Sequence, residues 1–283
     1  MRHSLLLRIA ELKGKLFFRD LSICLLFAGS VLSVQMYPSY LYMMILACSL
    51  IGSIFIFPNY KTTALTCCAF IGGFAVFKLL EQPLMVWMLE QDFPLEIAVI
   101  LGRVLVCSYI VFLFLAASFE HKKPMHYWRI GNFRERIAFP WIWKGFDHPP
   151  IWLFITIFSL ITSVMFIVTM FAIKPDSTLT IQLVMYSLLF ACINAPLEEI
   201  VWRGFILSRF VDTMGTVSAL IVTSVGFGFY HYALGIPLIG CIGFAIGSIY
   251  MAGLTLRSNG LLPVIIFHFV LNFWMFMSGA ITH

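Results

Sequence analysis

The sequence predicts an all-α polytopic membrane protein with about eight or nine transmembrane helices, and three observations support this prediction. Of the 283 residues, 61% are hydrophobic and 11% are charged, whereas an average soluble domain is about half apolar and about a quarter charged. Apolar runs close to the bilayer-crossing length of about 20 residues recur along the chain. Most charged residues lie between these runs. A water-soluble globule of this size is therefore excluded.

Nine candidate spans follow one another, and the first two are short. They cover residues 21–37, 40–57, 62–80, 95–118, 151–173, 180–211, 213–234, 236–256 and 260–281. Prolines such as Pro38 and Pro94 lie at span edges, where a missing N–H group does least harm. Pro196 is the exception, because it lies inside a span and predicts a kink there.

The chain divides into three predicted segments. Residues 1–118 comprise a helix on the membrane surface, indicated by apolar residues at helical spacing between Leu5 and Leu16, and then transmembrane helices. Residues 119–150 alternate basic and aromatic side chains, which is typical of a segment at the membrane interface. Residues 151–283 form a C-terminal transmembrane core that contains most of the intramembrane polar groups.

The distribution of basic residues predicts the orientation in the membrane. The first 19 residues contain five lysines and arginines, and Glu120–Pro150 contains six. Such loops face the cytoplasm, so we expect a cytoplasmic N-terminus and a cytoplasmic interfacial segment. The six basic residues of that segment are Lys122, Lys123, Arg129, Arg134, Arg136 and Lys144.

Two glutamates and an arginine lie inside the sixth span. A charged side chain at the centre of a bilayer costs about 2.5–3.5 kcal/mol on insertion scales, so Glu198, Glu199 and Arg203 mark a candidate functional site. Glu199 and Arg203 are four residues apart with the acid first, which favours an ion pair within the helix. We expect this pair to leave Glu198 free, with Asn194 one turn away as a hydrogen-bond partner.

Two histidines follow on later spans. His231 comes four residues after Phe227, and His268 comes four residues before Asn272. Residues four apart share one face of a helix, so His268 and Asn272 are directed at the same point. Packing against a neighbouring helix is the alternative interpretation of each pair.

Together the three motifs resemble those of the glutamate-dependent intramembrane proteases, the family that includes type II CAAX prenyl endopeptidases and Abi or bacteriocin-processing proteins. That family has E-E-x-x-x-R, F-x-x-x-H and H-x-x-x-N on successive membrane helices. The same motifs here are Glu198 to Arg203, Phe227 to His231 and His268 to Asn272. The resemblance covers about residues 180–280 and implies that residues 151–283 are a CAAX protease-like catalytic core, with the active site inside the C-terminal helix bundle.

The resemblance implies a role for each motif residue. Glu198 and His231 hold and deprotonate the attacking water, while His268 and Asn272 stabilise the oxyanion. General-base and oxyanion groups are also what peptide hydrolysis requires chemically. The predicted activity is therefore intramembrane endopeptidase cleavage of a membrane-associated peptide or protein.

The resemblance assigns structural roles to Glu199 and Arg203, and we expect no cofactor and no metal ion. Zinc-assisted hydrolysis with Glu198, His231 and His268 as ligands is an alternative, although the H-E-x-x-H spacing of many zinc proteases is absent. The seven cysteines lie in apolar stretches without C-x-x-C spacing, which indicates neither disulfides nor a thiolate site.

The expected partners are membrane lipids and a peptide or membrane-protein substrate, but not nucleic acid. The resemblance suggests the bacterial inner membrane as the location. A non-catalytic immunity or scaffold protein that binds a peptide is the second alternative, and a transporter is disfavoured because no repeated halves occur. Arg103, inside the fourth span, would reach an interface, meet a substrate carboxylate or, as we favour, pair with an acid such as Glu96.

Overall fold

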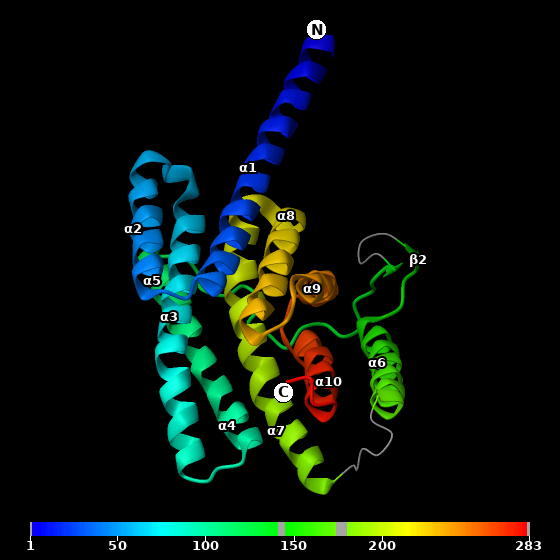
Figure 1. Ribbon diagram of the computed structural model, residues 1–283. Helices are drawn as coiled ribbons and strands as arrows, with labels where there is room; N and C mark the ends of the chain where they lie inside the picture. Colours follow the sequence, from blue (N-terminus) through cyan, green and yellow to red (C-terminus); the bar gives the residue numbers. More distant parts are fainter. Residues whose placement is uncertain (1, 141–144, 174–179, 282–283) are drawn as a thin grey trace. The chain divides into compact units, whose positions relative to one another are not determined.

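The computed structural model describes residues 2–140, 145–173 and 180–281, and nearly all of them are helical (Figure 1). The α-helices are α1 (Arg2–Met36), α2 (Tyr40–Ile56), α3 (Lys61–Glu90), α4 (Leu95–Gly102), α5 (Cys107–Phe119), α6 (Ile151–Ile173), α7 (Ile181–Glu199), α8 (Leu207–Tyr230), α9 (Leu238–Ser258) and α10 (Leu262–Met277). Three 3₁₀-helices, η1 (Pro58–Tyr60), η2 (Arg103–Val106) and η4 (His231–Leu234), and one π-helix, η3 (Ile200–Ile206), join them. A minimal antiparallel pair, β1 (Phe139–Pro140) and β2 (Gly145–Asp147), completes the elements.

The helices confirm the prediction of an all-α polytopic membrane protein. Six helical stretches within the described residues are long and apolar enough to cross a membrane, and the shorter helices α2 and α10 are also apolar. The longest stretch, Ile181–Leu234, covers two of the predicted spans. Gly215 separates them, because its φ of 79° is not helical. The chain is therefore a multi-pass membrane protein.

The chain forms two compact units. Unit 1 comprises Met1–Ile71 and Arg209–Ile249, and unit 2 comprises Gly72–Ser208 and Tyr250–His283. The positions of the two units relative to one another are not determined, so each is described by itself.

In unit 1, α1 packs against α3 and α8 through aromatic side chains. The ring of Phe27 lies 6.3 Å from that of Phe70 and 4.9 Å from that of Phe210, both edge to face. A Cβ atom at Gly228 would lie 2.7 Å from the Cβ of Ala245, so glycine permits α8 and α9 to approach closely. Residues 2–15 continue directly into the rest of α1, and their location at the membrane surface stays a prediction.

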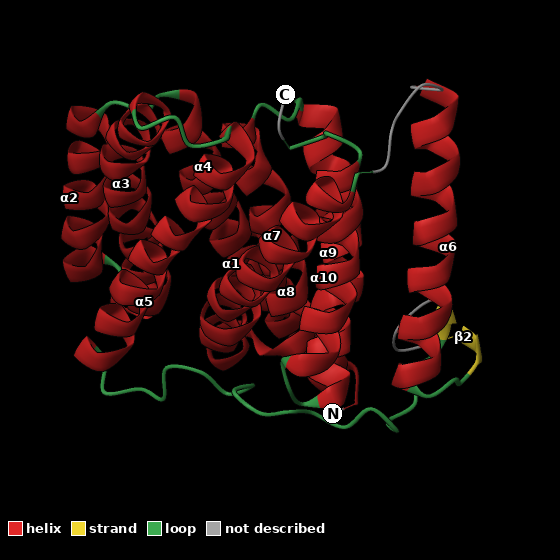
Figure 2. Ribbon diagram, turned by 90° about the horizontal axis from the view of Figure 1, so that it is seen from below, coloured by secondary structure: helices red, strands yellow, loops and turns green. Residues whose placement is uncertain are grey.

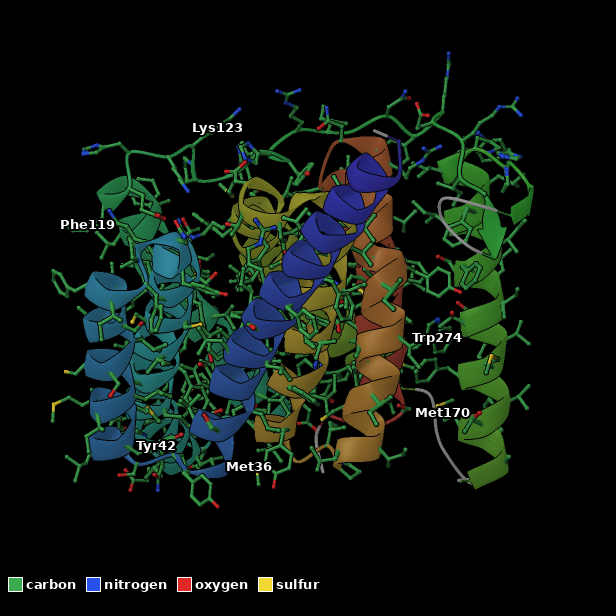
Figure 3. The ribbon with its side chains drawn as sticks, turned by 90° about the horizontal axis from the view of Figure 1, so that it is seen from above. Met36, Tyr42, Phe119, Lys123, Met170 and Trp274 are labelled. Carbon is green, nitrogen blue, oxygen red and sulfur yellow. The ribbon has the colours of Figure 1, made fainter. Side chains whose placement is uncertain are left out.

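In unit 2, α7 lies between α4 and α10 (Figure 2). The rings of Phe190 on α7 and Phe276 on α10 lie 5.0 Å apart, and Ile100 of α4 is buried in the same cluster. Trp274 of α10 points toward α6 (Figure 3), where its indole nitrogen donates a hydrogen bond to Ser163 at 2.7 Å. This packing buries one face of α7, which includes Phe190, Asn194 and Glu198.

The segment after α5, residues 120–138, crosses the ends of α9 and α10, and we call it the strap. The amide of Asn132 donates to the carbonyl of Ser258 at 2.8 Å, and the amide of Leu261 donates to the carbonyl of Arg129 at 3.0 Å. These backbone bonds fix the strap to the catalytic core that the sequence predicts.

The location of residues 119–150 at the membrane interface stays a prediction. Of the basic and aromatic residues in this segment, Trp141, Trp143 and Lys144 lie outside the described residues. Within the strap, Trp128 is 62% exposed, as an interfacial anchor requires.

Candidate active site

The two adjacent glutamates lie at the end of α7 in the interior of unit 2. Glu198 is 2% exposed and Glu199 is fully buried. Pro196, two residues before Glu198, removes one backbone donor from the helix, and the π-helix begins directly after Glu199. Segments of π-helix are rare and occur frequently at functional sites. The sequence predicted an irregularity here but not its form.

Glu199 forms the predicted ion pair with Arg203. Arg203 Nη1 donates to Glu199 Oε1 at 2.7 Å, and both side chains are completely buried. The two opposite charges therefore pair over four residues of the chain, and the interpretation of this pair from spacing is confirmed.

Glu198 also has an arginine partner, which contradicts the expectation that it is free. Arg103 of η2 donates from Nη2 to Glu198 Oε1 at 2.6 Å and from Nε to Asn194 Oδ1 at 2.6 Å. Asn194 therefore accepts from Arg103. Pairing of Arg103 with an acid is confirmed, but the acid is Glu198 and not Glu96. The two paired residues are 95 positions apart, which spacing along one helix cannot reveal.

His268 reaches both glutamates from α10. Its Nδ1 lies 2.7 Å from Glu199 Oε1, and its Nε2 lies 3.6 Å from Glu198 Oε2. The first distance is that of a hydrogen bond, in which Nδ1–H donates to the carboxylate, and the second is longer than a direct hydrogen bond. The ring is thus oriented by Glu199, with its other nitrogen turned toward Glu198.

Asn272 lies one turn after His268 on the same face of α10, as the spacing predicts. The side chain is 4% exposed. Among the described residues, its Nδ2 group has no hydrogen-bond partner. Since an unsatisfied buried polar group costs about 1–3 kcal/mol, this amide is available for a bound group.

His231 belongs to unit 1, at the junction of α8 and η4. It is 5% exposed, its Nδ1 lies 2.8 Å from the carbonyl oxygen of Phe227, and its ring stacks on Phe244 with centroids 3.8 Å apart. A carbonyl only accepts, so Nδ1 carries the proton and the neutral ring has its lone pair at Nε2. Because Glu198 belongs to unit 2, the pairing of His231 with Glu198 stays a prediction.

Gln35 of α1 holds the turn that carries His231, a role that the sequence analysis did not predict. Its Nε2 donates to the carbonyl of Phe229 at 3.0 Å, and its Oε1 accepts from the amide of Ala233 at 2.7 Å. A polar residue inside the first span was the only signal.

The described carboxylates and histidine at the centre of unit 2 do not form a metal site. Glu198 and Glu199 each bind an arginine, and His268 Nδ1 binds Glu199. Within residues 2–140, 145–173 and 180–281, no group of three His, Cys, Asp or Glu side chains is arranged to hold a metal. Two arginines balance the two carboxylates instead.

Comparison with known proteins identifies the region that contains the motifs. Residues 180–274 match the model of a family described as type II CAAX prenyl endopeptidase Rce1-like. No curated protein and no solved structure matches the chain. The match includes every motif residue, whereas Arg103 and Gln35 lie outside it. Residues 180–274 of this multi-pass membrane protein are therefore similar to the Rce1-like type II CAAX prenyl endopeptidase family, and this similarity supports, in general terms, an intramembrane CAAX-type protease.

Proposed function

We propose that the protein is an intramembrane endopeptidase that hydrolyses a peptide bond of a membrane-associated peptide or protein. In this proposal Glu198 and His231 activate the water, and His268 and Asn272 stabilise the oxyanion. Glu199 and Arg203 have structural roles. The membrane is the bacterial inner membrane, with the N-terminus in the cytoplasm.

The observation that carries the proposal is the buried amide of Asn272 without a partner among the described residues. It lies one turn from His268, whose Nε2 faces Glu198. The proposed base and the Asn272 amide, which has no partner among the described residues, thus both lie in the buried interior of unit 2. Peptide hydrolysis needs both, since water must lose a proton while the carbonyl oxygen gains negative charge.

The contacts of His268 support its role as an oxyanion donor. Glu199 accepts the Nδ1 proton, and a carboxylate in this position stabilises the positively charged ring. The charged ring also carries a proton at Nε2, where it donates to a developing oxyanion. Glu199 therefore acts through His268 and not on the substrate.

The steps conserve atoms and charge. Glu198 accepts a proton from water as the water oxygen bonds to the carbonyl carbon. The former carbonyl oxygen becomes an oxyanion and accepts hydrogen bonds from His268 and Asn272. The C–N bond then breaks, the proton passes from Glu198 to the leaving nitrogen, and an acid and an amine are released.

The test begins with the membranes of cells that carry the wild type or Glu198→Ala. Peptides that accumulate only in the variant are candidate substrates and are then offered to purified enzyme. We expect Glu198→Ala, His231→Ala and His268→Ala to fold and to lose cleavage. Gln182→Ala is the control, because within the described residues the side chain of Gln182 hydrogen-bonds to Tyr186 on the exposed part of α7 and to no proposed site residue. Unchanged cleavage by all three variants would refute the proposal.

A further inference from the structure

Arg103 is a buried arginine within a strongly apolar span. It is 7% exposed and lies in the helical stretch Leu95–Phe119, whose only other charged residue is Glu96. A 3₁₀-turn, η2, interrupts this stretch at Arg103, and such an interruption of a helix often marks a functional position. Its place in the membrane therefore requires an explanation.

Arg103 donates two hydrogen bonds to the helix that carries the glutamates. Glu198 and Asn194 are four residues apart on α7, so they share one face and receive the two donors of the guanidinium at 2.6 Å each. A planar guanidinium that binds two acceptors fixes their orientation more firmly than a single contact. The χ angles of Glu198 are thereby restrained.

The contact also distinguishes the two oxygens of Glu198. Oε1 receives Arg103, whereas Oε2 faces His268 Nε2 at 3.6 Å. The arginine thus leaves Oε2 directed at His268, which donates to the oxyanion in the proposed reaction. It also supplies the positive charge that an ionised carboxylate needs inside a membrane, just as Arg203 does for Glu199.

We propose that Arg103 is a positioning residue for the catalytic base, supplied by a part of the chain outside the matched family region. It keeps Glu198 ionised and keeps Oε2 turned toward the reacting water. The inference rests on the proposed function, because it assigns Arg103 to the base of that reaction.

The experiment measures kcat and KM of purified Arg103→Gln and Arg103→Lys, each expressed per folded molecule. We expect Arg103→Gln to lower kcat by about 100-fold, the usual effect of a misplaced catalytic group, with little change in KM. Arg103→Lys retains the charge and recovers part of kcat, and added guanidinium ions restore activity to Arg103→Ala. A merely structural role would change the folded amount and leave kcat unaltered.

Arg209→Gln is the matched control, since Arg209 is also buried and donates to Thr66 at 2.7 Å in unit 1. It should retain the wild-type kcat per folded molecule. If Arg103→Gln does not fold, Arg103→Lys decides instead. This variant lacks the guanidinium group, so a wild-type kcat in it overturns the inference. Wild-type kcat in Arg103→Gln also overturns it. An inactive Glu198→Gln beside an active Arg103→Gln refutes only this inference, whereas an active Glu198→Gln refutes the proposed function.

A different observation, in unit 1, carries a second inference. Gln35 is 7% exposed, and its side chain forms one hydrogen bond with Phe229, two residues before His231, and one with Ala233, two residues after it. We infer that Gln35 is a positioning residue for His231. Like Arg103, it belongs to the N-terminal half of the chain.

Gln35→Leu removes both hydrogen bonds at similar volume. We expect kcat per folded molecule to fall by about tenfold, as for outer partners of functional histidines, while KM is retained. Gln35→Glu keeps the acceptor for the amide of Ala233, so its kcat should lie between those of the wild type and Gln35→Leu. Gln182→Leu, on the exposed part of α7, is the control. Wild-type kcat in both Gln35 variants would contradict the inference.

Discussion

The two buried glutamates of α7 are neighbours in sequence but obtain their counter-charges from different regions of the molecule. Glu199 binds Arg203, four residues along the same helix, whereas Glu198 binds Arg103, which lies 95 residues earlier and outside the family match. A partner on the same helix face satisfies the charge locally. A partner from another helix restrains one oxygen and leaves the other directed at α10. In the proposed reaction, the motif therefore carries the reacting groups, whereas Arg103, from another region of the chain, positions one of them.

The largest expected effect is on stability and comes from breaking the local pair. Arg203→Met leaves the carboxylate of Glu199 buried without its arginine, and loss of one member of a buried pair costs about 3–5 kcal/mol of unfolding free energy. Arg103→Met should cost less, because the Arg103 side chain is 9% exposed while that of Arg203 is fully buried. Thermal unfolding of the detergent-solubilised variants measures both. Equal unfolding temperatures would contradict this ranking.

The next largest effect is on activity and comes from Asn272→Ala. Loss of one oxyanion donor lowers kcat by about 100- to 1000-fold. The unfolding temperature should hardly change, because the Nδ2 group makes no hydrogen bond within the described residues. Turnover of a purified substrate peptide provides the measurement, with Gln182→Ala as the control. A variant that cleaves at the wild-type rate would remove Asn272 from the site.

A smaller effect should follow from loosening the strap. Gly131 has a φ of +88°, and a Cβ there would lie 3.1 Å from the Cα of Gly260. Gly131→Ala should therefore lower the unfolding free energy by about 1–3 kcal/mol through backbone strain, without altering kcat per folded molecule. Gly243→Ala is the control, since open space surrounds Gly243. Equal stability of the two variants would show that the strap tolerates the change.

The smallest effect is expected from chelators. Each glutamate already binds an arginine, and the described part of the chain offers no group of three metal-binding side chains. Cleavage by purified enzyme should therefore continue at an unchanged rate after treatment with a strong zinc chelator. If the chelator abolishes activity and added zinc restores it, the account in which arginines pair both carboxylates is contradicted.

The sequence predicted the features that depend on local spacing. Apolar length located the spans, and the break at Gly215 lies close to the predicted boundary at residue 212. Spacing of four residues predicted the pair of Glu199 with Arg203 and the common face of His268 and Asn272. These features follow from helical geometry alone, so they need no knowledge of how the helices pack.

The features that the sequence did not predict depend on packing between distant segments. Arg103 reaches Glu198 only because α4 and η2 pack against α7, and no periodicity encodes that contact. Gln35 holds the turn of His231 by accepting a hydrogen bond from the amide of Ala233, which lies 198 residues later in the chain. The π-helix after Pro196 was expected only as a kink, because a proline predicts a lost hydrogen bond but not how the chain compensates. The pairing of His231 with Glu198 remains a prediction.

The central claim is that Glu198 acts on the water while Glu199 holds His268 and Arg203. The most direct test compares Glu198→Gln with Glu199→Gln, purified in parallel and assayed for cleavage of the same peptide per folded molecule. We predict that Glu198→Gln folds but does not cleave. Glu199→Gln should be less stable and cleave at a reduced rate, because its amide oxygen still accepts from both partners but no longer supplies the negative charge that stabilises the His268 ring. Cleavage by Glu198→Gln at the wild-type rate would contradict the account.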